Sequence, residues 1–161
     1  MLGSLVFLLV APGIVGFVIP WLLTGWRVHS YSVAAQLAGA VLIVLGLVVL
    51  LASFARFALE GLGTPAPVAP TERLVVGGVY RYVRNPMYLA VGATIAGQSL
   101  ALGQPGLIVY LVVFTVAVVA FVYLYEEPTL SARYGAEYDE YRRAVPGWLP
   151  RLSPWRPAGK R

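Results

Sequence analysis

Four long apolar blocks constrain this chain more than any other feature of its sequence. They cover residues 4–23, 33–54, 86–102 and 107–125. A helix needs about 20 mainly apolar residues to cross a bilayer, and the blocks are close to that length. The chain is 59% hydrophobic and 12% charged, whereas soluble domains average about 45–50% and about 25%. The sequence therefore predicts an all-α integral membrane bundle of about four transmembrane helices.

The 161 residues are expected to form a single membrane domain, because a chain of this length rarely holds more than one. Residues 1–54 would hold two N-terminal spans, 55–85 a cytoplasmic loop, 86–125 a two-span hairpin and 126–161 a cytoplasmic tail. Glycines and prolines crowd the centre of the loop, residues 61–70, and exclude a regular helix there. Loops this long in compact proteins are usually functional or linkers. With no second domain to connect, we expect this loop to serve the site.

Local signals indicate where the helices start, bend and pack. Asn85 is a good helix N-cap and Pro86 suits the first helical position, so the third helix should start there. Pro12 interrupts the first span, which a membrane helix tolerates when neighbours bond to the freed backbone groups. Ala35 and Gly39 place small residues on one face of the second span and would allow close helix contact.

The tail combines two acidic residues with an amphipathic pattern. The fourth block ends at Glu126, Glu127 and Pro128, where we expect the membrane helix to stop. Beyond it, hydrophobic residues recur at steps of three and four, which indicates a C-terminal amphipathic helix. They are Leu130, Tyr134, Tyr138, Tyr141 and Val145. Gly135 lies inside this stripe and could bend or break the helix.

The distribution of basic residues predicts the topology. Of twelve lysines and arginines, Arg27 alone lies in the first connection, and the others lie in the loop 55–85 or the tail. Cytoplasmic segments carry an excess of Lys and Arg. We therefore expect a multi-pass protein of the inner (cytoplasmic) membrane, with both termini and the active site on the cytoplasmic side. The net charge of +5 then reflects this bias and contact with membrane lipids, and we expect no nucleic acid partner.

Several kinds of site are excluded by residue counts. The chain has no cysteine, which excludes disulfides, thiolate metal sites and cysteine nucleophiles. Its one histidine, His29, cannot form a histidine metal cluster, so we expect no metal. The first block has no basic segment before it and no cleavage site of small residues after it, which favours a retained span over a signal peptide.

Chemistry-bearing residues gather where the loop meets the third block. Arg81 and Arg84 are three residues apart, and Tyr80, Tyr82 and Tyr88 lie among them. The arginines could equally contact lipid headgroups, and the tyrosines could form an interfacial aromatic belt.

The acidic pair allows two interpretations. At the C-terminal end of a helix the dipole disfavours Glu126 and Glu127 by up to ~1 kcal/mol each. A cationic partner would offset that cost, and the candidates for a structural ion pair are Arg81, Arg84 and Arg133. Alternatively, both carboxylates would simply be exposed to water.

Taken together, four segments resemble the isoprenylcysteine carboxyl methyltransferases and the phospholipid methyltransferases, which share one signature. The segments are Gly78–Tyr88 (GVYRYVRNPMY), Glu126–Glu127, Tyr134–Tyr141 (YGAEYDEY) and Val145–Pro150 (VPGWLP). They occur in the family's order with a membrane span between the first and the second. The resemblance covers about residues 61–152, and the first two spans match only as generic membrane helices.

The resemblance implies a membrane-embedded methyltransferase that uses S-adenosylmethionine. By position, Tyr80, Arg84, Asn85, Pro86 and Tyr88 match the segment that lines the cofactor pocket. Glu126 and Glu127 match the acidic pair that helps to bind the cofactor, and Tyr138, Tyr141 and Arg142 match the tail that closes over it. Arg84 and Glu127 are the catalytic candidates. The eukaryotic carboxyl methyltransferases carry histidine in place of Asn85, and asparagine cannot titrate near neutral pH.

The acceptor that the resemblance implies is a small lipophilic molecule or a lipid. Methyl transfer from a sulfonium needs mainly alignment and desolvation. Carboxylate acceptors need no base, whereas a protonated amine does, and the motifs contain no obvious base. Carboxyl methylation and phospholipid or amine N-methylation nevertheless both stay open. A non-catalytic transporter or assembly protein would instead predict charged residues inside the spans, and the four blocks contain none. Four spans bury little surface, so a homodimer is a further expectation.

Overall fold

A computed structural model describes residues 10–29, 32–60 and 73–156, and every regular element in these ranges is helical. An N-terminal helix, Val10–Thr24, contains the π turn η1 (Ile14–Val18) and α2 (Ile19–Thr24). It is followed by α3 (Val33–Glu60), the 3₁₀ turn η2 (Gly78–Arg81), α4 (Pro86–Leu102) and α5 (Gly106–Phe121). The π turn η3 (Val122–Glu126), α6 (Glu127–Tyr134) and α7 (Ala136–Ala144) complete the fold. The predicted all-α class is confirmed.

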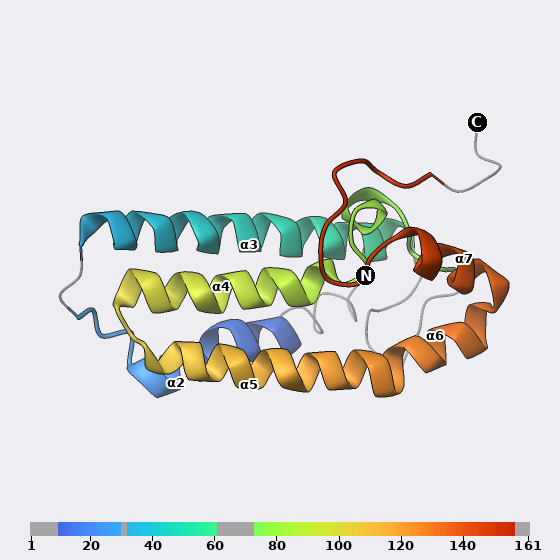
Figure 1. Cartoon of the computed structure of the whole chain (residues 1–161). Coiled ribbons are helices and arrows are strands. Elements are labelled where there is room, and N and C mark those ends of the chain that lie inside the picture. Colours follow the sequence, from blue (N-terminus) through green and yellow to red (C-terminus); the bar gives the residue numbers. More distant parts are fainter. Residues whose placement is uncertain (1–9, 30–31, 61–72, 157–161) are drawn as a thin grey trace.

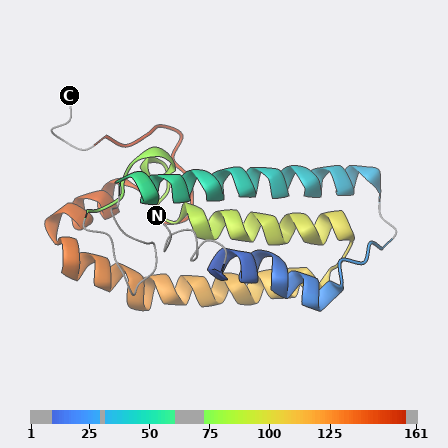
Figure 2. The same ribbon diagram turned by 180° about the vertical axis from the view of Figure 1, so that it is seen from behind.

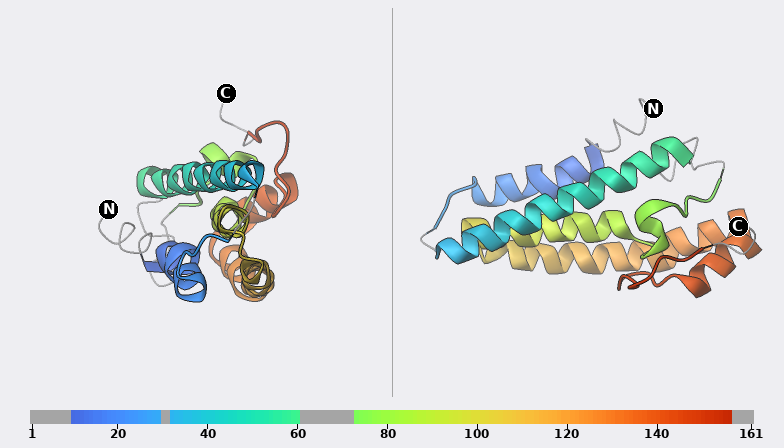
Figure 3. Two further views of the ribbon diagram at one scale, coloured as in Figure 1. Left: turned by 90° about the vertical axis from the view of Figure 1, so that its left-hand side faces the viewer. Right: turned by 90° about the horizontal axis from the view of Figure 1, so that it is seen from above.

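The helices form an antiparallel bundle with α4 at its centre (Figure 1). Seen end-on, α4 lies between α3 on one side and α2 and α5 on the other (Figure 3). The apolar core follows this arrangement, because Ala90, Val91 and Ile95 of α4 are buried against Leu50 and Phe54 of α3. α4 therefore provides the surface on which the other helices assemble.

Small residues let α3 and α4 approach closely. A Cβ atom on Gly39 would lie 2.5 Å from the Gly97 carbonyl oxygen, and one on Gly46 would lie 2.7 Å from the Ala90 carbonyl oxygen. Both distances are shorter than any normal contact, so the two backbones touch where these glycines sit. The predicted small-residue face thus includes Gly39 and, two turns later, Gly46.

Two helices are long and apolar enough to cross a membrane, Val33–Phe57 and Gly106–Tyr134, and Val10–Thr24 and Pro86–Leu102 are shorter apolar helices. The outward faces of α3 and α5 carry exposed valines and leucines, such as Val48 and Val116, as a lipid-facing surface would. The number of spans stays a prediction at four.

α3 ends later than its hydropathy suggests. We expected a loop from residue 55, but α3 continues to Glu60. Its last turns pack against η2, where the Phe57 and Tyr80 rings meet edge to face with centroids 5.5 Å apart. The expectation was wrong because loss of hydrophobicity marks the end of a lipid-facing surface and not the end of a helix. The Gly- and Pro-rich centre of the predicted loop lies outside the described residues.

The fourth helix also extends beyond its predicted end. We expected it to stop at Glu126–Pro128, but it continues through η3 and α6 to Tyr134. Pro128 lacks an N–H and its ring crowds the preceding turn, and the wider π turn comes directly before it, with Glu127 N–H bonded to the Val122 carbonyl. The proline therefore changes the pitch of the helix without ending it.

A π turn before a proline also occurs in the N-terminal helix, where η1 precedes Pro20. Pro20 cannot donate to the Gly16 carbonyl, and Gln98 Nε2 of α4 donates to it at 2.7 Å. The Tyr110 hydroxyl of α5 donates to the neighbouring Val15 carbonyl at 2.9 Å. Neighbouring helices thus satisfy the freed backbone groups, as a membrane interior requires. An interruption is therefore found before Pro20. The one predicted at Pro12 involves residues 4–9, which lie outside the described residues.

The tail folds back on the bundle. Gly135, at φ 55°, breaks the predicted amphipathic helix into α6 and α7, which meet at an angle (Figure 2). The hydrophobic stripe nevertheless forms one cluster, in which Tyr138, Tyr141 and Val145 are buried against Leu130 and Tyr134. The break lets one stripe cover the region around η2, where Leu74 and Trp155 complete the cluster.

The close approach of α3 and α4 generates a stability prediction. Gly39→Ala should lower the free energy of unfolding by about 1–3 kcal/mol, because the added methyl overlaps the α4 backbone. Thermal unfolding of the purified protein in detergent measures the change. Gly106→Ala is the matched control, since a Cβ there meets nothing within 4 Å. Equal stability of the two variants would show that α3 and α4 are not held in this contact.

Candidate active site

A cavity of about 230 Å³ lies between the N-terminal helix, η2, the start of α4 and the end of α5. Six of the residues predicted to bind a cofactor line it. They are Tyr80, Arg84, Asn85, Pro86, Tyr88 and Glu126. The other predicted residues, Glu127, Tyr138, Tyr141 and Arg142, lie behind this wall and hold the tail against it.

Glu126 and Glu127 have different surroundings. Successive residues of a helix point about 100° apart, so two neighbours can face different partners. Glu126 lines the cavity, and its Oε2 accepts a hydrogen bond of 3.0 Å from the Tyr88 hydroxyl. Glu127, only 3% exposed, points toward the tail. The pair that the sequence treats as one feature thus divides into a cavity carboxylate and a structural one.

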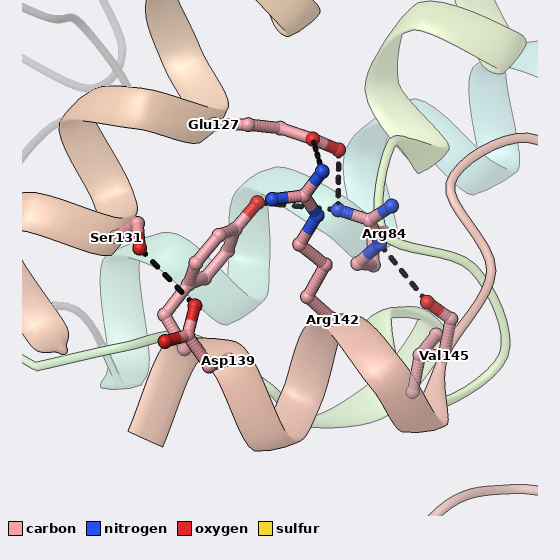
Figure 4. A network of polar contacts seen from close by, with 7 residues as sticks. Arg84, Glu127, Ser131, Asp139, Arg142 and Val145 are labelled. Carbon is pink, nitrogen blue, oxygen red and sulfur yellow. Dashed lines mark hydrogen bonds and ion pairs between the residues drawn. The ribbon is translucent and has the colours of Figure 1, made fainter. Parts of the chain in front are cut away.

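Glu127 binds two arginines from different parts of the chain (Figure 4). Its Oε1 lies 2.6 Å from Arg84 Nη1, and its Oε2 lies 2.9 Å from Arg142 Nη2. Arg84 also donates from Nε to the Val145 carbonyl oxygen at 2.9 Å and from Nη1 to the Tyr138 hydroxyl at 3.2 Å. We call this set of contacts the Glu127 clamp, because it ties the start of α4 to α6 and α7.

The clamp corrects the expected electrostatics of the acidic pair. Because the helix continues past Glu127, the carboxylates do not stand at a helix C-terminus and the predicted dipole cost does not arise. Of the expected partners, Arg84 binds Glu127, whereas the Arg133 guanidinium lies over the Tyr134 ring, 5.7 Å from the ring centroid. Arg81 instead donates to the Trp155 carbonyl oxygen at 2.7 Å.

Protonation in the clamp follows from its contacts. Burial alone would lower the pKa of the Arg84 guanidinium, but its hydrogen bond and charge interaction with Glu127, followed by Tyr138, raise the pKa above its usual value. Burial raises the pKa of Tyr138. Arg84 is therefore a permanent cation, and the Tyr138 hydroxyl stays neutral.

Asn85 lies at the predicted N-cap position, and α4 starts at Pro86 as expected, but the Asn85 side chain makes no capping bond. Its Nδ2 is instead buried and has no hydrogen-bond partner among the described residues. Gly147 packs over it so closely that a Cβ there would lie 3.2 Å from Arg84 Nη2 and 3.5 Å from Asn85 Nδ2. An unpaired buried donor costs about 1–3 kcal/mol, which a ligand with an acceptor atom would offset.

The tyrosines of η2 and α7 connect the cavity wall to the tail. Tyr80 lines the cavity, and its carbonyl oxygen accepts a 2.7 Å hydrogen bond from the Tyr141 hydroxyl. Burial raises the pKa of both hydroxyls, so Tyr141 stays protonated and keeps donating. Tyr141 therefore supports the wall from behind.

Sequence reasoning missed the apolar part of the cavity. Ala11, Pro12 and Val15 of the N-terminal helix line it, and so do Phe57 of α3 and Phe114 of α5. These residues carry no chemical signature, and they meet only because the helices pack. The first two helices, which the family resemblance left without a role, thus form part of the site.

The clamp predicts a larger loss of stability on removing Glu127, its central residue, than on removing its exposed partner Arg142. Glu127→Ala should lower the free energy of unfolding by about 3–5 kcal/mol, because it leaves the buried Arg84 charge unpaired. Arg142→Ala should cost about 1 kcal/mol or less, because the Arg142 side chain is 48% exposed and exposed pairs contribute little. Thermal unfolding in detergent, with Arg143→Ala as the control, tests this order. Equal losses for the two variants would contradict it.

Comparison with known proteins identifies the family of the chain. A family model described as phospholipid methyltransferase matches residues 34–137, which is more than half of the 161-residue chain. The match begins in α3 and ends in α7, so it includes η2, α4 and the acidic pair. No curated protein and no solved structure matches the chain. The chain therefore belongs to the phospholipid methyltransferase family of membrane enzymes.

Proposed function

We propose that this enzyme uses S-adenosylmethionine to methylate a small lipophilic acceptor in the membrane, as an isoprenylcysteine carboxyl methyltransferase does. The observation that carries the proposal is the cavity, whose polar wall joins Glu126, Asn85 and Arg84 beside tyrosine and phenylalanine rings. When bound, the cofactor supplies a methyl group whose bond to sulfur breaks as the bond to the acceptor forms. The protein itself provides binding, alignment and exclusion of water.

The residue types of the cavity fit a cationic amino-acid cofactor. The Glu126 carboxylate would attract its ammonium or sulfonium charge. The buried Nδ2 of Asn85 can donate to an acceptor such as a carboxylate, and so can Arg84. Tyr80 and Phe57 offer aromatic faces for a cation or an adenine ring. Arg84 thus links the cavity to the Glu127 clamp.

This arrangement divides the predicted residues into two groups. Tyr80, Arg84, Asn85, Pro86, Tyr88 and Glu126, which line the cavity, would contact the cofactor. We propose that Glu127, predicted from the sequence as catalytic, positions Arg84 instead, because both of its oxygens are engaged in ion pairs. Tyr138, Tyr141 and Arg142 would act through the same contacts.

A phospholipid or amine N-methyltransferase is the second candidate. Amine acceptors must lose a proton before or during attack, and Glu126 is a cavity carboxylate that could accept it. The sequence motifs alone indicated no such base. The two candidates make chemically different products, a methyl ester or an N-methyl amine.

The arrangement of the bundle supports the proposed topology. Arg27 lies at one end of the bundle, near the turn between α4 and α5, where its carbonyl oxygen accepts a 2.8 Å hydrogen bond from Gln104. η2, α6 and α7 lie at the opposite end (Figure 1). We propose that the second end faces the cytoplasm of a multi-pass inner-membrane protein. A homodimer stays a prediction.

The cofactor proposal is tested by titrating the purified protein with S-adenosylmethionine in a calorimeter. Glu126→Gln should weaken binding at least tenfold, because a hydrogen bond to a charged group contributes about 1.5–3 kcal/mol and about 1.4 kcal/mol is a factor of ten. Arg143→Ala, on the outer face of α7, should bind like the unchanged protein. Absence of binding to the unchanged protein at millimolar cofactor would refute the proposed function. Equal binding by Glu126→Gln would refute only the role of this residue.

The type of acceptor is tested with membranes that contain the enzyme and with cofactor carrying a radioactive methyl group. Alkali hydrolyses a methyl ester and releases the label as volatile methanol, whereas an N-methyl group stays bound to nitrogen and is not volatile. We expect the label in the lipid extract to become volatile on alkali treatment. Label that stays non-volatile would contradict methyl ester formation, and its recovery in an N-methylated amine would establish N-methylation.

The topology is tested with single cysteines, since the chain has none of its own. Val28→Cys lies at the Arg27 end and Glu140→Cys lies in α7, and both side chains are exposed. A membrane-impermeant maleimide applied to intact cells should label the first and not the second, and permeabilised cells should label both. Labelling of Glu140→Cys in intact cells would reverse the orientation.

A further inference from the structure

A second hollow lies between α4 and α5, beside the proposed cofactor site. Its volume is about 300 Å³. Gly92, Ala93 and Ala96 of α4 form one wall, Leu111 and Thr115 of α5 form the other, and Trp148 lies at one end. The Thr115 hydroxyl donates a hydrogen bond to the Leu111 carbonyl oxygen, 2.8 Å away. The walls therefore present hydrocarbon, and we refer to this hollow as the α4–α5 groove.

The groove adjoins the cavity. Tyr88, Phe114 and Val118 line both of them, so these three side chains separate the two spaces. A third apolar hollow, about 320 Å³ between α3 and α4, shares only Pro86 with the cavity. Among these hollows, the α4–α5 groove therefore shares the most lining residues with the proposed cofactor site, which favours it.

We propose that the α4–α5 groove binds the apolar chain of the methyl acceptor, with the acceptor group at Tyr88 and the chain running toward Ala96. This inference rests on the proposed function and adds where the acceptor lies and what limits its length. The Tyr88 end also carries the polar atoms, because the Tyr88 hydroxyl bonds to Glu126 at 3.0 Å. An occupant with a polar head and one apolar tail fits this gradient.

Positions along α4 indicate how far the bound lipid chain extends from Tyr88. Gly92 is one turn and Ala96 two turns beyond Tyr88, which places them roughly 6 Å and 12 Å along the helix axis. The absence of large side chains at these positions keeps the groove open. A Cβ on Gly92 would lie 3.6 Å from Leu111 Cδ1 and 3.8 Å from Phe114 Cε1. A methyl therefore fits, whereas a leucine would fill the groove.

Trp148 closes the Tyr88 end of the groove. Its ring centroid lies 6.5 Å from that of Tyr88, and it follows Gly147, which packs on Arg84 and Asn85. The segment that covers the proposed cofactor site therefore also contributes to the groove. The segment that contains Gly147 and Trp148 would thus contact both the cofactor and the acceptor.

The groove is tested with a photoreactive lipid, which requires neither the cofactor nor turnover. Purified protein is irradiated with a fatty acid that carries a terminal diazirine, and in a second arm with the same chain in phosphatidylethanolamine. Peptide mapping should place adducts on the stretches 92–96 and 111–115. Labelling by the fatty acid alone or by both lipids distinguishes a single-chain acceptor from a phospholipid one.

Two variants and one control make the result specific. Gly92→Leu should reduce labelling of the groove several-fold, and Ala96→Leu should move the adducts toward Tyr88. Ala117→Leu, on the exposed face of α5, should change nothing. Adducts spread over the outer face of α5, at Val112 and Val116, and insensitive to Gly92→Leu would overturn the proposal.

Calorimetry with S-adenosylmethionine distinguishes an error in the groove proposal from an error in the proposed function. Ala96→Leu should bind S-adenosylmethionine as the unchanged protein does, since Ala96 does not line the cavity and lies two turns beyond Tyr88. Cofactor binding without groove labelling would refute the groove alone. Groove labelling without cofactor binding would refute the methyltransferase site that we propose and leave a lipid site.

Discussion

The structure depends most on one buried ion pair, between Arg84 and Glu127. A buried charge without a partner is costly, and removing one member of such a pair destabilises a protein more than the pair itself stabilises it. Here the pair joins residues 43 positions apart and recruits Arg142, Tyr138 and the Val145 carbonyl from the tail. The start of α4, the helix after η3 and the tail are therefore positioned together. Because Arg84 also lines the cavity, the interaction that holds the tail in place defines one wall of the proposed site.

Prolines contribute to this arrangement through the backbone. Each of the two π turns precedes a proline, Pro20 or Pro128. The wider turn rotates the residues that follow it, and π turns often occur at functional sites. At η1, the freed carbonyls of Val15 and Gly16 accept bonds from Tyr110 and Gln98, which tie the N-terminal helix to α4 and α5. At η3, the turn brings Glu126 to the cavity and Glu127 to the clamp.

Much of the fold could be predicted because apolar blocks of span length must become helices in a membrane. The errors fell at helix ends, at residues 55–60 and 126–134, where polar residues continue a helix that tertiary contacts support. Site prediction had a similar limit. Motif positions identified Tyr88 and Glu126, which meet in the cavity, but they also placed Glu127 there, and they could not identify Phe57 or Val15. A motif records which residues matter, whereas packing decides which surface each one faces.

The order and composition of the residues alone establish an all-helical membrane enzyme of the phospholipid methyltransferase family, because hydropathy and motif order require no coordinates. They also identify the basic, aromatic segment before α4 as a candidate part of the functional site. Only the tertiary structure assigns adjacent carboxylates to different tasks and opens an apolar groove beside Tyr88. It also buries Asn85 Nδ2 without a hydrogen-bond partner in the described part of the chain. These features depend on a rotation of about 100° per residue and on how closely helices approach. Neither can be read from a linear sequence, because both arise when segments far apart in the chain share one space.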